Sequence, residues 1–136
     1  MLKQEHIEAK LKDAGLRPTR QRLLLGELLW KVDHRHVTAE QLHFETKEAN
    51  MPVSLATVYN TLHQFTDAGL LKEISVDGSS SYFDTNIKPH YHLYHTDSGK
   101  LEDIAVSAMP VPNLPSLPKG ATVESVDVVI RVSGAA

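Results

Sequence analysis

The chain has 136 residues, of which 41% are hydrophobic and 23% charged, as expected for a globular protein of one domain or two small ones. It has no cysteine, which excludes disulfides and thiolate metal sites. It also has no apolar run of membrane-spanning length and no signal-peptide core, so a cytoplasmic protein without a membrane partner is expected. The net charge of -3 is unevenly divided: residues 1–72 hold ten Lys/Arg against nine Asp/Glu, and residues 73–136 hold four against eight. This asymmetry permits nucleic-acid binding by the first half and disfavours it for the second.

Two helices are predicted in the first 32 residues. Residues 3–14 show an amphipathic pattern with Ile7 and Leu11 on the apolar side. A second helix begins after Pro18 with Thr19 as its N-cap. Its predicted buried face consists of Leu23, Leu24, Leu28, Leu29 and Val32.

Arg20 and Arg22 occupy the first turn of this second helix, where the helix macrodipole disfavours cations. A phosphate bound at the helix N-terminus would explain their position, since anions favour such termini. The alternative is a pair of solvated arginines tolerated at slight cost.

Two more helices follow a polar linker over residues 33–36. Thr38 and Gln41 form a capping-box pattern at the start of a helix over residues 39–49. The next helix lies within residues 53–71, with Ser54 as N-cap and Gly69 as the stop. At 100° per residue its apolar arc comprises Leu55, Val58, Leu62 and Phe65.

The opposite side of this last helix is small and polar, and Asp67 is its only charge. An uncharged face of this kind suits a DNA major groove, where Asn, Thr and Tyr meet base edges and thymine methyl groups. The alternative is a neutral helix facing solvent. The face comprises Ala56, Thr57, Asn60 and Gln64, with Tyr59 and His63 on its margin.

Two strands, over residues 71–76 and 80–84, follow the helices and are joined through Asp77-Gly78, a strong hairpin signal. Three helices with a short turn before the last, followed by a hairpin, is the winged helix-turn-helix order. The predicted class is therefore α+β. Residues 1–85 are expected to form a winged-helix DNA-binding domain, and residues 86–136 a small α/β domain.

The second domain is predicted to hold short strands over residues 91–95 and 101–104, around a turn at Ser98-Gly99. Residues 109–119 contain four prolines and cannot form one regular helix. Residues 122–132 alternate as a strand, with Val126, Val128, Ile130 and Val132 on one side. So thin a sheet has exposed edges that a second copy of the chain would cover, and a homodimer is expected.

His90 and His92 lie two residues apart on a predicted strand, so both imidazoles leave from the same face. This is a chelating arrangement, and Asp84, Asp103 and His36 are candidate partners. Imidazoles and carboxylates without thiolates suit Zn²⁺, Mn²⁺ or Fe²⁺. The alternative is surface histidines that share no ligand.

Five motifs in order resemble the ferric uptake regulator family over roughly residues 10–104: GLRPTRQR, HVTAEQL, SLATVYNTL, DAGLLKEI and HYHL. The resemblance implies a dimeric winged-helix transcription factor whose DNA affinity responds to a metal or another signal. It places Tyr59 at a base-contacting position and Arg17 at a basic position that enters the minor groove. The candidate DNA-binding residues are Arg17, Arg20, Ser54, Thr57, Tyr59 and Asn60. The family's regulatory metal site falls on His36, Asp84, His90, His92 and Asp103, with aspartates where glutamate is usual.

The chain departs from the family pattern at two places. The Cys-x-x-Cys of a structural zinc site is here His95-Thr96-Asp97-Ser98, so that zinc is not expected, and Tyr91 replaces a carboxylate of a third site. Loss of the zinc site with retention of His-x-His resembles the haem-responsive iron response regulators of alphaproteobacteria. The resemblance makes haem a further candidate cofactor, with His43, His63, His90 and His92 as its candidate ligands.

The sequence therefore predicts a DNA-binding regulator of iron homeostasis, responsive to metal or haem, and not an enzyme. A manganese- or zinc-responsive repressor of the same family is the nearest alternative. A metal-dependent hydrolase using His36, Asp84, His90 and His92 is another, although no nucleophile or phosphate-cradling loop is evident. A winged-helix protein that binds DNA constitutively, with inert histidines, is the third.

Overall fold

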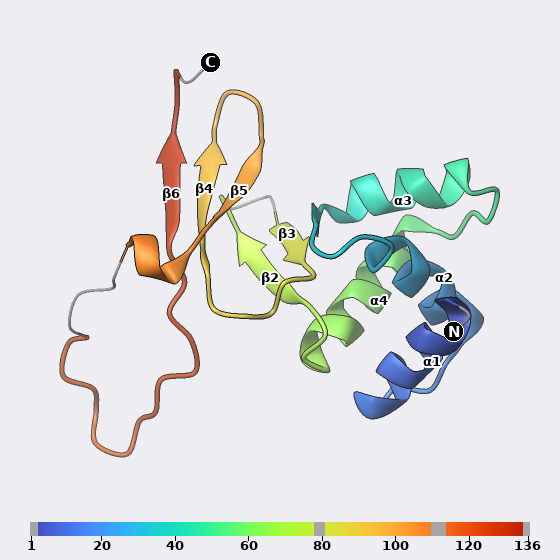
Figure 1. The fold of residues 1–136 in the computed structure, drawn as a ribbon, viewed down its shortest axis with the longest axis horizontal. Coiled ribbons are helices and arrows are strands. Elements are labelled where there is room, and N and C mark those ends of the chain that lie inside the picture. The colour runs from blue at the N-terminus through green and yellow to red at the C-terminus, as the bar shows by residue number, and fades with distance from the viewer. Residues whose placement is uncertain (1–2, 78–80, 110–113, 135–136) are drawn as a thin grey trace. The chain divides into compact units, whose positions relative to one another are not determined.

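The computed structural model describes residues 3–77, 81–109 and 114–134. The chain divides into two compact units, Met1–Ile87 and Lys88–Ala136. The first unit contains four helices and a small sheet, and the second contains another small sheet (Figure 1). The predicted α+β class is confirmed.

The four helices of the first unit are α1 (Lys3–Asp13), α2 (Arg20–Leu29), α3 (Ala39–Glu48) and α4 (Leu55–Asp67). The three predicted N-caps are confirmed, because each hydroxyl accepts the backbone N–H of the residue three positions later. The oxygen–nitrogen distances are 3.2 Å at Thr19, 3.1 Å at Thr38 and 3.1 Å at Ser54. Gly69, with a φ of +81°, follows α4 and provides the left-handed residue that ends it.

The core of the first unit collects the apolar faces of the four helices and residues from its sheet. Gly26 of α2 lets α1 approach closely, because a Cβ there would lie 2.8 Å from Trp30 Cζ3 and 2.9 Å from Ile7 Cγ2. The fully packed cluster is Ile7, Leu11, Leu25, Leu29, Val37, Ala39, Leu42, Val58, Leu62, Phe65, Leu71 and Phe83.

The expectation that Val32 is buried is wrong. The helix α2 ends at Leu29, where the backbone N–H of Trp30 bonds to the carbonyl of Gly26. Val32 therefore lies beyond the helix and is 51% exposed, whereas Leu25, omitted from the predicted face, is fully buried. Extending the helical period past a real helix end caused the error.

The polar linker before α3 contains a strand that the sequence analysis missed, β1 (His36–Val37). It pairs antiparallel with β3 (Ser81–Asp84), which also pairs with β2 (Lys72–Ser75), in the order β1-β3-β2. The strands β2 and β3 pair antiparallel as predicted, and Gly78 of the predicted Asp77-Gly78 turn lies outside the described residues. Residues 36–37 form a strand because they pair with β3, which is distant in sequence. A strand of two residues is too short to show a periodic pattern, so the sequence did not reveal it.

Arg35 fixes the position of β1. Its guanidinium donates to the carbonyl of Leu28 at 2.9 Å and to both carboxylate oxygens of Glu45 at 3.0 and 2.6 Å. Its backbone N–H donates to the hydroxyl of Thr85 at 3.0 Å, and the N–H of Thr85 donates to the carbonyl of Arg35 at 3.1 Å. The residue before His36 is thus tied to α2, to α3 and to the segment after β3.

The second unit is a three-stranded sheet of order β5-β4-β6, with β4 (Tyr91–His95), β5 (Leu101–Ile104) and β6 (Val129–Val132). The predicted strands at 91–95 and 101–104 are confirmed, and β4 pairs antiparallel with β5. A short 3₁₀ helix, η1 (Val106–Ala108), follows β5. In the described residues 114–119 there is no regular helix, as the prolines require.

The strand predicted over residues 122–132 is confirmed only at its end. Residues 129–132 pair parallel with β4 from His92 to His95, and none of the described residues 114–128 belongs to a strand. Val123 and Val126 are exposed. Residues 128–130 and 132 are half-buried, so Val129 is not separated from the predicted face; β4 begins at Tyr91 and offers residues 122–127 no ladder to join.

Hydrogen bonds to Thr96 and Asp97, which lie between the two positions where the resemblance would place zinc ligands, hold the chain around β6. The N–H of Thr96 donates to the carbonyl of Val132 at 2.9 Å, and the hydroxyl of Thr96 donates to the same oxygen at 3.1 Å. The carboxylate of Asp97 accepts the N–H of Gly134 at 2.7 Å. These contacts join the β4–β5 turn to the chain around β6.

Candidate metal centre and nucleic-acid interface

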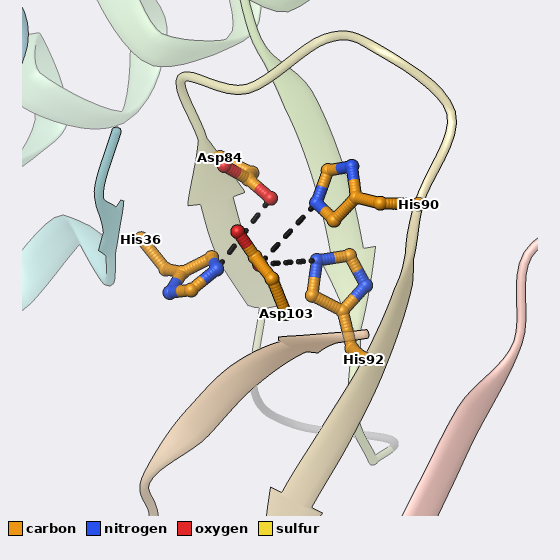
Figure 2. A group of neighbouring side chains, drawn as sticks. All are labelled: His36, Asp84, His90, His92 and Asp103. Atoms are coloured by element: carbon orange, nitrogen blue, oxygen red, sulfur yellow. Dashed lines mark ion pairs between the residues drawn. The ribbon is translucent and has the colours of Figure 1, made fainter. Parts of the chain in front are cut away.

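The first unit brings two of the predicted metal ligands together, His36 and Asp84. They face each other as register partners of β1 and β3, and His36 Nε2 lies 3.6 Å from Asp84 Oδ2 (Figure 2). Asp84 is fully buried, and its other carboxylate oxygen accepts the N–H of Asn86 at 2.8 Å. The sheet register thus supplies one nitrogen and one oxygen donor at adjacent positions.

The second unit brings together the other three, His90, His92 and Asp103. His92 and Asp103 are register partners of β4 and β5. Asp103 Oδ1 lies 3.4 Å from His90 Nε2 and 3.6 Å from His92 Nε2, while the two imidazole rings lie 4.4 Å apart between centroids (Figure 2). Both histidines are buried and Asp103 is partly exposed.

The spacing within each set fits donors arranged around an ion. Nitrogen–oxygen separations of 3.4 to 3.6 Å are too long for good hydrogen bonds. Two donors at about 2.1 Å from one ion and at a tetrahedral angle would lie roughly 3.4 Å apart. The ring of His90 is also oriented as a ligand, because its Nδ1 lies 2.6 Å from the carbonyl of Lys88. If Nδ1 carries the hydrogen and donates it to this carbonyl, Nε2 of the neutral ring is unprotonated. Its lone pair then faces Asp103 and can bind a metal ion.

The helix α4 presents the predicted uncharged face. Ala56, Asn60 and Gln64 are exposed, whereas Thr57 and Tyr59 are half-buried. The predicted apolar arc is confirmed, with Val58, Leu62 and Phe65 buried and Leu55 packed against the core. Ser54 caps the helix and also donates its hydroxyl to Thr57 Oγ1 at 2.9 Å.

The arginines near α2 divide into two kinds. Arg17 and Arg20 are exposed, and Arg20 lines a shallow hollow with Asn50 and Pro52. Arg22 donates through Nε and Nη2 to Gln64 Oε1 at 3.2 and 3.0 Å, and through Nη1 to the carbonyl of Arg17 at 2.8 Å. Arg22 thus joins α2 to α4, a role that the sequence analysis did not predict.

Tyr59 donates its hydroxyl to Glu40 Oε2 on α3, at 2.9 Å. This bond, with partial burial and the charge of Glu40, raises the pKa of Tyr59. Sequence reasoning missed Glu40, because only the packing of α3 on α4 brings the two residues together.

The two histidines proposed for haem lie on different helices. His63 of α4 is 52% exposed; its ring stacks on Tyr59 at 6.4 Å between centroids and meets the ring of Phe83 edge-on at 5.6 Å. Its Nδ1 lies 3.8 Å from Glu73. His43 is half-buried in α3. Within the part of the chain that the structure describes, no hydrogen bond or ion pair joins His43 to His63.

Comparison with known proteins gives concordant matches. A model of the "Ferric uptake regulator family" matches residues 13–129. The "Ferric uptake regulation protein" of Shigella flexneri is 40% identical over 92 residues, covering 67% of this chain and 62% of that protein. The "Peroxide-responsive repressor PerR" of Staphylococcus aureus is 38% identical over 99 residues, covering 73% of this chain and 66% of that protein.

The likeness extends to the fold. The structure of a ferric uptake regulator from Pseudomonas aeruginosa with manganese has a TM-score of 0.74 and 26% identity, and covers 94% of this chain and 97% of that one. The chain spans somewhat less than two thirds of the length of the curated relatives that it matches.

Proposed function

Because this chain belongs to the ferric uptake regulator family, we propose that it is a metal-responsive, sequence-specific DNA-binding regulator of iron homeostasis that acts in the cytoplasm. The observation that carries the proposal is the set of imidazole and carboxylate donors on β1, β3, β4 and β5 and, at His90, directly before β4. In this proposal residues 1–85 bind DNA, and residues 86–136 sense the metal and form the homodimer.

The two donor sets are proposed to bind one divalent ion together. Two donors and three donors are each too few for a closed site, whereas five suit an ion of four to six ligands. Asp84 and His90 are only six residues apart, so the chain holds the two sets within about 20 Å at full extension. An ion bound by both sets would restrain residues 85–89, and its binding would then be linked to DNA affinity.

Iron is the proposed physiological ion, by analogy with the regulation protein of Shigella flexneri. Nitrogen and oxygen donors without thiolates also suit manganese and zinc, and the Pseudomonas aeruginosa structure was solved with manganese. A manganese- or zinc-responsive repressor is therefore the alternative within the family. Metal content of protein isolated from its native host distinguishes the three ions.

For DNA, α4 is proposed to enter the major groove with Thr57, Tyr59 and Asn60 toward the bases. Arg17, Arg20 and the capped N-terminus at Ser54 would meet the phosphate backbone, where exposed cations and helix N-termini bind anions. The open strand edges of β5 and β6 favour pairing with a second copy, and a dimer would read two half-sites.

The test measures metal binding and DNA binding separately. Replacing His90 and His92 together by Ala should abolish stoichiometric binding of Mn²⁺, followed by calorimetry, and should abolish metal-dependent DNA binding. A matched control replaces two exposed histidines, His6 and His34, by Ala and should change neither. Unchanged Mn²⁺ binding in the first variant would refute the proposed site.

DNA reading is tested on sequences enriched from a random pool. Tyr59→Ala should cost about 1–3 kcal/mol on the enriched sequence and relax base preference. Arg20→Ala should weaken binding to all sequences and flatten the salt dependence. DNA affinity that is indifferent to metal would instead support a constitutive DNA binder. The matched relatives are regulators and not enzymes, so a hydrolase is not proposed.

Haem is a second candidate signal, favoured by the exposed ring of His63 beside Tyr59. Haem ligated there would lie against the proposed DNA-reading face, and its propionates would repel phosphates. Haem and DNA would then weaken each other's binding by the same factor. Operator affinity with and without haem, for wild type and His63→Ala, tests this idea. Equal loss of DNA binding in both proteins would exclude His63 and leave His43, His90 and His92.

A further inference from the structure

The hydrogen bond between Tyr59 and Glu40 determines what the tyrosine hydroxyl can offer to a ligand. A tyrosine hydroxyl carries one hydrogen and two acceptor lone pairs. In the structure that hydrogen is directed to Glu40 Oε2, 2.9 Å from the phenol oxygen. The aromatic ring is restrained as well, because it packs against the core and stacks on His63. Tyr59 is thus held as an acceptor.

We propose that Glu40 is a positioning residue that sets which bases Tyr59 selects. The inference rests on the proposed function, with α4 in the major groove. There adenine and cytosine present amino donors, whereas the O6 and N7 of guanine and the O4 of thymine are acceptors. A hydroxyl committed to Glu40 accepts a hydrogen from adenine N6 or cytosine N4. The same oxygen is repelled by guanine O6 or thymine O4, because both atoms of the contact are then acceptors and no hydrogen lies between them.

The location of Glu40 agrees with this role. It is exposed in the first turn of α3, where the helix dipole favours a negative charge. An acidic side chain beside DNA repels phosphates, so a carboxylate here lowers affinity for every sequence alike. Its hydrogen bond to Tyr59 gives it a sequence-dependent effect in addition, and the two effects can be separated by experiment.

The experiment enriches sequences from a random DNA pool with the full-length, Mn²⁺-loaded protein and compares five forms. These are wild type, Tyr59→Phe, Glu40→Ala, the double variant, and Glu48→Ala as a control that removes the same charge from the exposed far end of α3. Wild type should enrich adenine or cytosine at one position of the strand that Tyr59 meets. Tyr59→Phe should lose about fivefold of that preference, the effect of one hydrogen bond.

Glu40→Ala should free the hydroxyl to donate, so guanine or thymine becomes acceptable at that same position, and the double variant should match Tyr59→Phe there. Glu48→Ala should leave the base preference unchanged. The proposal is overturned if Glu40→Ala raises affinity for all sequences while the preference at the Tyr59 position stays as in wild type. It is also overturned if wild type prefers guanine or thymine there. If the wild-type protein enriched no sequence from the pool, that result would instead refute the proposed function.

Discussion

Removing the Arg35 guanidinium, by Arg35→Met, tests the account of how β1 is held. The methionine keeps most of the apolar stem, so the change removes mainly the bonds to Glu45 and to the carbonyl of Leu28. The backbone bonds between residue 35 and Thr85 do not depend on the side chain. The variant should therefore lose stability while keeping the strand pairing that positions His36.

The structure sets the size of the effect. The side chains of Arg35 and Glu45 are only 14% and 17% exposed, so their ion pair is largely removed from water. Breaking a fully buried pair costs about 3–5 kcal/mol, because the remaining charge is left uncompensated. Lys31, whose Nζ lies 3.7 Å from Glu45, and the residual solvent contact reduce this figure. We expect a loss of about 2–3 kcal/mol, a large share of the roughly 5–15 kcal/mol typical of a folded domain.

The measurement is urea unfolding of metal-free protein, followed by circular dichroism, for wild type, Arg35→Met, Glu45→Gln and the double variant. The losses of unfolding free energy in the two single variants should add up to more than the loss in the double variant. The difference should exceed about 1 kcal/mol, because residues in contact are energetically coupled. Additive losses, or a drop below about 1 kcal/mol for Arg35→Met, would refute the account. A folded Arg35→Met that no longer binds Mn²⁺ would show that the side chain, and not the strand pairing, positions His36.

Three further changes test other contacts. Gly26→Ala should destabilise the fold by about 1–2 kcal/mol in urea unfolding, because the added Cβ would overlap Trp30. An unchanged urea midpoint would show that the indole moves aside. Asp97→Ala removes the acceptor of the Gly134 N–H, so it should speed amide hydrogen exchange around β6 and lower stability by about 1 kcal/mol. Unchanged protection from exchange would mean that this hydrogen bond is dispensable. The hydrogen bond from His95, with the charge of a nearby lysine, lowers the pKa of Glu102 below its usual 4.5. The stability it contributes is present above that pH and is lost as pH falls through the lower folded pKa. The thermal midpoint of Glu102→Gln should therefore approach that of wild type under acid, and a gap that is constant from pH 7 to pH 3 would contradict this.

The parts of the fold that depend on neighbours in sequence could be read from the sequence. Caps such as Thr19 and Ser54 bond to residues three positions away, and the apolar arc of α4 follows from its helical period. The predicted strands β4 and β5 flank a turn at Gly99, whose φ of +75° suits glycine. In each case the determining interaction spans a few residues, so composition and spacing were sufficient.

Tertiary structure decided the features that depend on partners distant in sequence. β1 exists because residues 36–37 pair with β3 nearly fifty positions later, and β6 is short because β4 offers a ladder only to its last residues. The burial of Asp84 opposite His36, and the bond from Tyr59 to Glu40, likewise arise from sheet register and helix packing. Sequence alone named the chemical groups of the candidate site. Their distances, burial and hydrogen-bond partners come from long-range packing, which no local pattern encodes.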